Sequence, residues 1–187
     1  MEPQGSRRII HLGQSAMDRA GKTRRNTGRM SVVELTDLPQ RLTGGERLLG
    51  LDLGEKTIGL AVSDSARRVA SPVDTIRRGK FTKDAKDLLH LCAERGVGGL
   101  VIGLPVNMNG SEGPRCESVR QFAANLIEIA GYSGPIAFWD ERLSTAAVER
   151  ILIDEGDLSR KRRAKSVDRM AAAFILQGAL DFLARGG

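Results

Sequence analysis

Three acidic side chains that lie far apart in the chain could together bind a metal ion. Asp52 interrupts the apolar run LLGLDL, and a carboxylate is rare in a buried strand unless something pairs with it. Glu141 stands at the end of a second apolar segment, and Asp168 lies near the start of a long predicted helix. Carboxylates that meet without a counter-ion resist ionising together, and a divalent cation removes that cost.

The chemistry that such a cluster predicts is hydrolysis of phosphodiester bonds. Oxygen ligands without histidine or cysteine suit Mg²⁺ or Mn²⁺, with waters and substrate phosphates completing the coordination shell. In a two-metal site one ion activates a water molecule and the other stabilises the departing oxygen. We therefore expect the same three carboxylates to be both metal ligands and catalytic groups.

Two alternatives bear on these assignments. Asp52 could instead form a structural salt bridge with Arg142 or Lys165. For Glu141 the alternative is Asp140, because neighbouring residues of a strand point to opposite faces of a sheet. Only one of the two is therefore expected to share the site.

Candidate substrate-binding residues lie close to these carboxylates in the sequence. In the glycine-rich loop GLPVNMNGSEG, Asn107 and Asn109 could donate hydrogen bonds to phosphates or sugars, although Asn109-Gly110 is also typical of a plain turn. Arg142 directly follows Glu141. A basic segment precedes Asp168, and we expect phosphate contacts from it, with a solvated loop as the alternative. Its cationic residues are Lys161, Arg162, Arg163 and Lys165.

The elements that must position these residues follow from hydrophobic patterning and turn residues. Three strands are predicted first, over residues 47–54, 57–64 and 69–76. The turns between them are short, so the strands must form an antiparallel meander, and Pro72 favours an edge position for the third.

Helices and strands then alternate. Buried strands are predicted at 98–103 and 135–139, and each is preceded by a helix, so they can pair in parallel. Further helices are expected over 144–156 and 166–184. Ser166 would cap the last of these, placing Asp168 in its first turn, where the helix dipole stabilises a negative charge. The predicted fold class is α/β: a mixed five-stranded sheet, three antiparallel strands then two parallel, flanked by helices.

Charge is distributed unevenly along the 187 residues. Residues 1–30 hold seven basic and two acidic side chains, which is +5 of the net charge of +6. This segment has almost no apolar periodicity, and we expect it to be disordered. It is either a nucleic-acid-binding arm or the product of an upstream start codon, with Met30 as the natural first residue. We therefore divide the chain into a basic extension, 1–46, and one nuclease domain, 47–187.

Several classes of protein are not expected from this composition. No apolar stretch is long enough to span a membrane, and the N-terminus lacks a secretory signal pattern. Cys92 and Cys116 are too few and too far apart for a zinc site or a redox pair. We expect them to be reduced core thiols and the protein to be cytoplasmic.

Four segments, in order and spacing, resemble the bacterial YqgF (RuvX) family: GLDLGEKTIGLAVSD, VIGLPVNMNGSEG, DERLST and KSVDRMAAAFIL. The resemblance covers residues 47 to about 184. Members are described as Holliday-junction-resolvase-like proteins or as nucleases that mature the 5′ end of the 16S ribosomal RNA precursor. The resemblance implies a ribonuclease-H-like fold and places the family's acidic positions at Asp52, Glu141 and Asp168.

The resemblance also defines the partners and the alternatives. The expected partner is nucleic acid, either a ribosomal RNA precursor or branched DNA, bound by a monomer or homodimer. The alternatives are a Holliday junction DNA resolvase and a non-catalytic RNA- or ribosome-associated binding module. The first motif also fits the phosphate-binding hairpin of actin-like kinases. Those proteins need two such domains to close over ATP, and residues 47–187 offer one.

Overall fold

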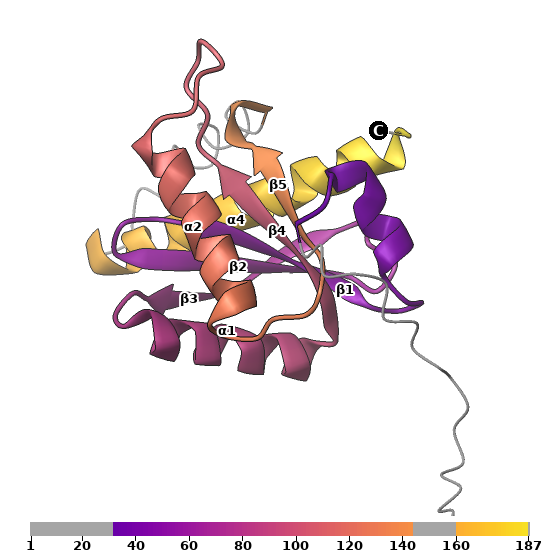
Figure 1. The fold of residues 1–187 in the computed structure, drawn as a ribbon, viewed down its shortest axis with the longest axis horizontal. Coiled ribbons are helices and arrows are strands. Elements are labelled where there is room, and N and C mark those ends of the chain that lie inside the picture. The colour runs from indigo at the N-terminus through magenta and orange to yellow at the C-terminus, as the bar shows by residue number, and fades with distance from the viewer. Residues whose placement is uncertain (1–31, 144–159, 187) are drawn as a thin grey trace, which may run out of the picture.

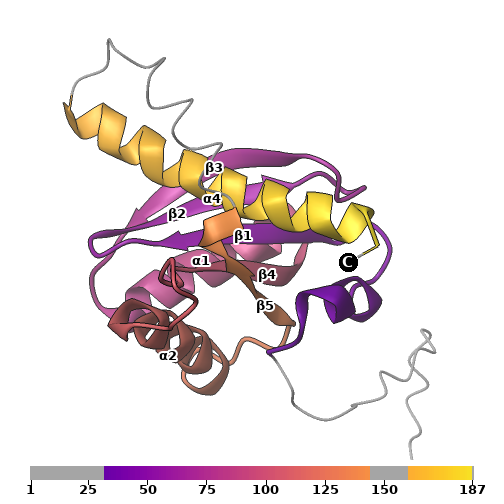
Figure 2. The same ribbon diagram turned by 90° about the horizontal axis from the view of Figure 1, so that it is seen from above.

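A mixed β-sheet with helices on both faces forms the centre of the molecule (Figures 1 and 2). The structure is a computed structural model that describes residues 32–143 and 160–186, with side chains described from residue 167 in the second range. Its strands are β1 (Arg47–Leu53), β2 (Thr57–Ser63), β3 (Ala70–Arg77), β4 (Val97–Leu104) and β5 (Ile136–Asp140). Its helices are η1 (Leu35–Arg41), α1 (Phe81–Arg95), α2 (Pro114–Glu128), η2 (Glu141–Leu143) and α4 (Arg160–Ala184).

The strand order is β3-β2-β1-β4-β5. β2 is antiparallel to both β1 and β3, whereas β4 is parallel to both β1 and β5. The expected α/β class is confirmed: three antiparallel strands and two parallel ones, the arrangement of a ribonuclease-H-like fold. β3, which contains Pro72, is an edge strand as predicted.

Side chains along β1 point alternately to the two faces of the sheet, and the core accordingly has two layers. Leu49, Leu51 and Leu53 pack with α1 and α2 in one buried cluster. Leu48 packs in a second cluster with α4, and Gly50 contacts that helix directly. Figure 2 shows α4 crossing one face of the sheet while α1 and α2 cover the other. Asp52 has the same parity as Leu48 and Gly50, so it belongs to the α4 face.

Four of the five strands run in the same direction, which gives the sheet two distinct ends. We call the end formed by Leu53, Arg77, Leu104 and Asp140 the carboxyl end, and the end formed by Arg47, Ala70, Val97 and Ile136 the amino end. α1 and α2 both begin at the carboxyl end. The carboxyl end therefore collects the residues that follow β1, β3, β4 and β5.

The folded body begins before Arg47. Leu38 of η1 is fully buried in the cluster beneath α4, and the backbone amide of Val33 donates a 2.8 Å hydrogen bond to the carbonyl of Ile136. Residues 32–46, which the sequence had suggested were part of the extension, thus pack on the domain. Residues 1–31 and the helix expected over 144–156 lie outside the described residues.

The last helix differs from its expected start. α4 begins at Arg160 rather than at Ser166, so the basic segment is helical and Asp168 is the ninth residue of the helix, in its third turn. The residues RKRRAK contain no glycine or proline and favour helix, which explains why the helix extends upstream. The expected dipole stabilisation of Asp168 therefore does not apply.

Two smaller expectations concern the core and membranes. Cys92 and Cys116 are both free and buried, as predicted. Within the described residues, the structure contains no helix with the length and apolar character that crossing a membrane requires.

Candidate active site

Asp52 lies between two glycines at the carboxyl end of the sheet. In the antiparallel pair it faces Gly59 of β2. In the parallel pair Leu51 faces Ile102, which places Gly103 of β4 beside Asp52 on its other flank. Neither neighbour has a side chain, so groups from outside the sheet can approach Asp52 from both sides.

Gly59 brings Asp168 into position. A Cβ atom on Gly59 would overlap the backbone carbonyl of Asp168, so α4 crosses β2 in direct backbone contact. Gly50 makes a similar contact farther along the helix, where its Cβ would lie 2.8 Å from the carbonyl oxygen of Ala172. Two glycines on neighbouring strands thus seat α4 so that Asp168 lies over the strand next to Asp52.

Gly103 gives the corresponding space to Glu141. A Cβ atom on Gly103 would lie 2.6 Å from Oε1 of Glu141 and 2.5 Å from Cδ1 of Ile175. Glu141 is the first residue of η2, directly after β5. Its carboxylate therefore fills the position that a side chain on β4 would occupy, on the flank of Asp52 opposite to Asp168.

The electrostatics show that the three carboxylates interact. The pKa of Asp52 is raised from 3.8 to about 7, first by burial and then by the negative charges of Glu141 and Asp168. The pKa of Glu141 is also raised, mainly by burial. Within the described residues, the carboxylate of Asp52 accepts no hydrogen bond and forms no ion pair. Asp52 therefore carries partly buried negative charge that no direct side-chain partner in the described residues neutralises.

The alternative salt bridge from Arg142 to Asp52 is not formed. Arg142 pairs instead with Asp140, through contacts of 2.6 and 3.0 Å from Nη2 and Nε to Oδ2, and the hydrogen bond to Arg142 lowers the pKa of Asp140. Asp140 is thus engaged by a cation, whereas Glu141 lies beside Asp52. The side chain of Lys165 lies outside the described residues.

The donor set fits a hard divalent cation in its chemistry, but it is not a preformed cage. Three carboxylates, two of them with pKa values raised by burial, are the oxygen ligands that Mg²⁺ and Mn²⁺ accept. In the described part of the chain, no group of three or more His, Cys, Asp or Glu side chains is close enough to hold an ion. The carboxylates are coupled neighbours, and closing them around an ion requires side-chain movement.

Arg115 is a cation of this site that sequence reasoning missed. It is the second residue of α2, it is exposed, and its charge lowers the pKa of both Asp52 and Glu141. The sequence held a signal, since Arg115 follows the glycine-rich loop by two residues and comes directly after Pro114, a residue favoured in the first turn of a helix. What it could not show is that this helix begins at the same end of the sheet as Asp52.

The loop between β4 and α2 is shaped by its own asparagines. Asn107 donates a 3.0 Å hydrogen bond to Oγ of Ser111, and Asn109 accepts hydrogen bonds from the backbone amide and hydroxyl of Ser111. Gly110 has a φ of 84°, and a Cβ there would lie 3.7 Å from Nη1 of Arg142. The loop therefore extends over Arg142 with both asparagines exposed.

The remaining predicted substrate-binding residues lie in the first turns of α4. The backbone of this segment is helical, and its side chains lie outside the described residues. The residues concerned are Lys161, Arg162, Arg163 and Lys165.

Comparison with known proteins gives one family and many relatives. Residues 46–182 match the family described as RuvX, Holliday junction resolvase. A protein of Paramagnetospirillum magneticum named "Putative pre-16S rRNA nuclease" is 61% identical over 152 residues, 81% of this chain and 96% of the relative. A protein of Phenylobacterium zucineum with the same name is 60% identical, over 82% of this chain and 98% of the relative.

Among solved structures, the similarity is to resolvases at low sequence identity. RuvC of T. thermophilus in complex with a Holliday junction substrate aligns with a TM-score of 0.48 and 13% identity. That alignment covers 76% of this chain and 96% of RuvC.

Proposed function

The chain belongs to the RuvX family, and from this premise we propose that it is a metal-dependent nuclease that hydrolyses phosphodiester bonds in structured nucleic acid. We propose the 16S ribosomal RNA precursor as its substrate, because relatives that are 61% and 60% identical are named as pre-16S rRNA nucleases. Cleavage at the 5′ end, in the cytoplasm, is the part of the proposal that the sequence resemblance suggests. The observation that carries the proposal is the position of two further carboxylates, Glu141 and Asp168, beside the glycine-flanked Asp52.

The residues of the site have distinct roles in this proposal. Asp52, Glu141 and Asp168 would hold one or two Mg²⁺ or Mn²⁺ ions, and their mutual repulsion favours binding of cations. A divalent cation bound there lowers the pKa of a water molecule and stabilises negative charge on a leaving oxygen. In the reaction a water oxygen bonds to phosphorus, the bond from phosphorus to the bridging oxygen breaks, and that oxygen takes up a proton.

Arg115 would keep the substrate phosphate beside the three carboxylates. A carboxylate cluster alone repels a phosphodiester, so a cation nearby is needed to draw the backbone in. Arg115 comes from α2, on the opposite side of the sheet from α4, and it interacts electrostatically with two of the three carboxylates. We propose that it contacts a phosphate oxygen next to the scissile bond, and that the glycine-rich loop and Arg142 contact the backbone farther along.

The test is cleavage of a precursor transcript that carries the 5′ extension of 16S ribosomal RNA, with Mg²⁺ present. We expect the wild-type protein to cleave it and Asp52→Asn to cleave it more than about 100-fold more slowly. Mutation of residues that only hydrogen-bond to metal ligands already lowers metal affinity or activity by about 10–100-fold. Asp64→Asn is the matched control. It makes the same chemical change at the amino end of the sheet, and it should cleave as the wild type does.

A second candidate function, cleavage of four-way DNA junctions, is favoured by the description of the family as Holliday junction resolvase. The same three proteins should be assayed on a DNA junction at the same salt concentration, because the charge-driven part of binding does not distinguish sequences. Faster cleavage of the junction would replace the RNA substrate. Failure of the wild type on both substrates, with Mg²⁺ and with Mn²⁺, would leave a non-catalytic RNA- or ribosome-associated module.

A further inference from the structure

A group of exposed cations lies at the carboxyl end of the sheet, on the other side of Asp52 from the glycine-rich loop. They come from the β1–β2 turn, the last residue of β3, the residue before α1 and the first two turns of α1, and every one of them is exposed. We call this surface the basic ridge. Its residues are Lys56, Arg77, Lys80, Lys83 and Lys86.

The ridge is attached to the strand that carries Asp52. Arg78 donates a 2.7 Å hydrogen bond from Nη1 to the carbonyl of Gly54, two residues beyond Asp52, and its backbone amide bonds to the carbonyl of Lys56 at 2.9 Å. Two residues of strand span about 7 Å, so Gly54 lies roughly that far from Asp52 along the chain. The β1–β2 turn therefore links the strand of Asp52 to the ridge.

A buried carboxylate fixes the segment that joins β3 to α1. Asp84 is only 3% exposed, and both of its oxygens accept hydrogen bonds from the amide of Gly79, at 2.9 and 3.2 Å. Burying a carboxylate is costly unless it is hydrogen-bonded, and here the bonds hold the backbone between Arg78 and Lys80. The cations at the start of the ridge are therefore presented by an ordered backbone.

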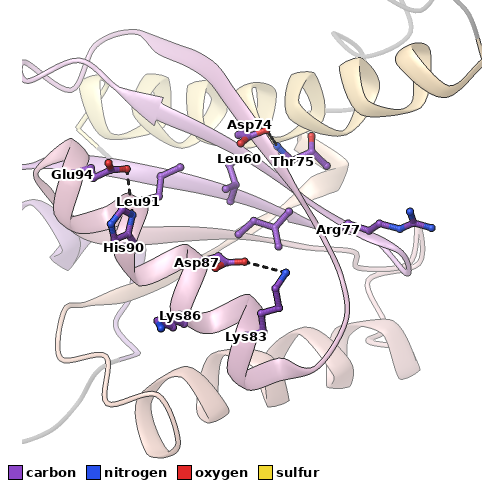
Figure 3. Close-up of a pocket in the computed structure, with 11 residues that line it drawn as sticks. Leu60, Asp74, Thr75, Arg77, Lys83, Lys86, Asp87, His90, Leu91 and Glu94 are labelled. Atoms are coloured by element: carbon purple, nitrogen blue, oxygen red, sulfur yellow. Dashed lines mark hydrogen bonds and ion pairs between the residues drawn. The ribbon is translucent and has the colours of Figure 1, made fainter.

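Most of the positive charge on the ridge is not neutralised. Lys83 lies 3.6 Å from Asp87, and because both side chains are largely exposed this pair contributes little. Lys56, Arg77, Lys80 and Lys86 form no ion pair within the described residues. In Figure 3, Lys83 reaches toward Asp87, whereas Arg77 extends from the end of β3 away from the hollow between β3 and α1.

We propose that the basic ridge binds the sugar-phosphate backbone of a double-stranded arm of the substrate, which leaves the carboxylate pocket across the β1–β2 turn and runs over the start of α1. This inference rests on the proposed nuclease function and adds a second contact surface to it. Each strand of a duplex presents a phosphate about every 3.4 Å along the axis, so several phosphates fall within reach of the ridge. Phosphate contacts of this kind fix the orientation of the substrate without reading its sequence.

The test compares two triple variants that lose the same charge at opposite ends of the sheet. Lys56→Gln/Lys80→Gln/Lys86→Gln neutralises the ridge. Arg41→Gln/Arg95→Gln/Arg185→Gln is the matched control, because Arg41 and Arg95 end η1 and α1, Arg185 follows α4, and all three are exposed cations at the amino end. Binding of a fluorescently labelled short RNA duplex is measured by anisotropy, with EDTA present, over a series of KCl concentrations.

For the ridge variant we expect affinity to fall roughly 10-fold or more. The slope of log K against log salt should become shallower by about 2 to 3, since each lost phosphate contact accounts for about 0.9. The control should keep the wild-type affinity and slope. The proposal is overturned if the ridge variant matches the wild type, or if the control loses as much affinity as the ridge variant does.

Binding without Mg²⁺ separates this inference from the proposed function. If Asp52→Asn loses cleavage while the ridge variant binds the duplex normally, the proposed role of the ridge is wrong and the proposed nuclease function stands. Glutamate in place of glutamine at the same positions, Lys80→Glu/Lys86→Glu, should weaken duplex binding further. If it does, and if the ridge variant still folds as judged by its thermal unfolding midpoint, the ridge is supported whatever the cleavage assays show.

Discussion

Asp52 and Asp64 stand at opposite ends of the same pair of strands, and they have opposite electrostatics. Asp64 follows β2 at the amino end, where it accepts hydrogen bonds from the amides of Arg68 and Val69 at 2.7 and 3.0 Å, and these lower its pKa. Asp52, at the carboxyl end, is half-buried beside two other carboxylates, and its pKa is raised to about 7. The same residue type thus stabilises a turn at one end and remains unneutralised at the other.

The rest of the amino end follows the pattern of Asp64. The hydroxyl of Ser63 is 1% exposed, accepts a 2.9 Å hydrogen bond from the amide of Leu48 and donates a 2.8 Å one to the carbonyl of Asp64. Arg67 donates to the carbonyl of Glu46. These polar groups at the amino end therefore complete each other's hydrogen bonds, whereas at the carboxyl end the carboxylate of Asp52 has no hydrogen-bond partner within the described residues.

The largest effect is expected when α4 is displaced from the carboxyl end. Gly59→Ala places a Cβ against the carbonyl of Asp168, so the helix must shift. We expect a loss of about 1–3 kcal/mol in the free energy of unfolding and roughly 100-fold in cleavage, since a displacement of about 1 Å can have that cost. Gly44→Ala, which meets nothing within 4 Å, is the control and should change neither quantity. Normal cleavage by Gly59→Ala would show that the position of Asp168 does not matter.

The second effect concerns the energetic cost of the unneutralised carboxylate. Because the pKa of Asp52 is higher in the folded chain than in the unfolded one, metal-free protein should lose stability as the pH rises from about 3.8 through about 7. The shift corresponds to at most about 4 kcal/mol. Asp52→Asn should remove this loss, so in urea denaturation with EDTA it should be more stable than the wild type at pH 8 and similar near pH 4. If Asp52→Asn is no more stable than the wild type at pH 8, the predicted repulsion at Asp52 is contradicted.

At the amino end we expect a substitution to lower the stability of the protein and to leave cleavage unchanged. Ser63→Ala leaves the buried amide of Leu48 without its acceptor, and we expect a loss of about 1–3 kcal/mol in the free energy of unfolding. Cleavage by the folded variant should match that of the wild type, because the hydroxyl is far along β2 from Asp52. If Ser63→Ala is fully stable but inactive, the amino end contributes to catalysis, and the proposed difference between the two ends is wrong.

The smallest effect should come from the cation that offsets the repulsion. Arg115→Gln removes the charge that lowers the pKa of Asp52 and Glu141, and it removes the proposed phosphate contact. We expect roughly tenfold slower cleavage, or about 1.4 kcal/mol in the barrier. Arg115→Lys should restore part of the rate, and Arg95→Gln, at the far end of α1, should leave it unchanged. Wild-type rates for Arg115→Gln would exclude Arg115 from the site.

Sequence patterns predict the sheet well because turn length and alternation determine it locally. Short turns made the first three strands antiparallel, and the helices before β4 and β5 allowed parallel pairing. Asp52 stood out because a carboxylate within an apolar strand has few structural explanations. The parity of β1 then placed it on the face that α4 covers.

The parts that could not be predicted depend on register and on where helices begin. The positions of Gly59 and Gly103 beside Asp52 follow from the pairing of β1 with β2 and β4, which no single segment encodes. Asp168 lies in the third turn of α4 because the basic segment continues the helix upstream. Arg142 pairs with its near neighbour Asp140, an outcome that the sequence left open.

Binding of Mn²⁺ to the purified protein, measured by isothermal titration calorimetry, tests the convergence of the carboxylates most directly. The wild type should bind the ion, and Asp52→Asn, Glu141→Gln and Asp168→Asn should each weaken binding by about tenfold or more, while Asp64→Asn should not. If any one of the three variants binds Mn²⁺ as tightly as the wild type, that side chain lies outside the site and the three carboxylates do not share one cation pocket.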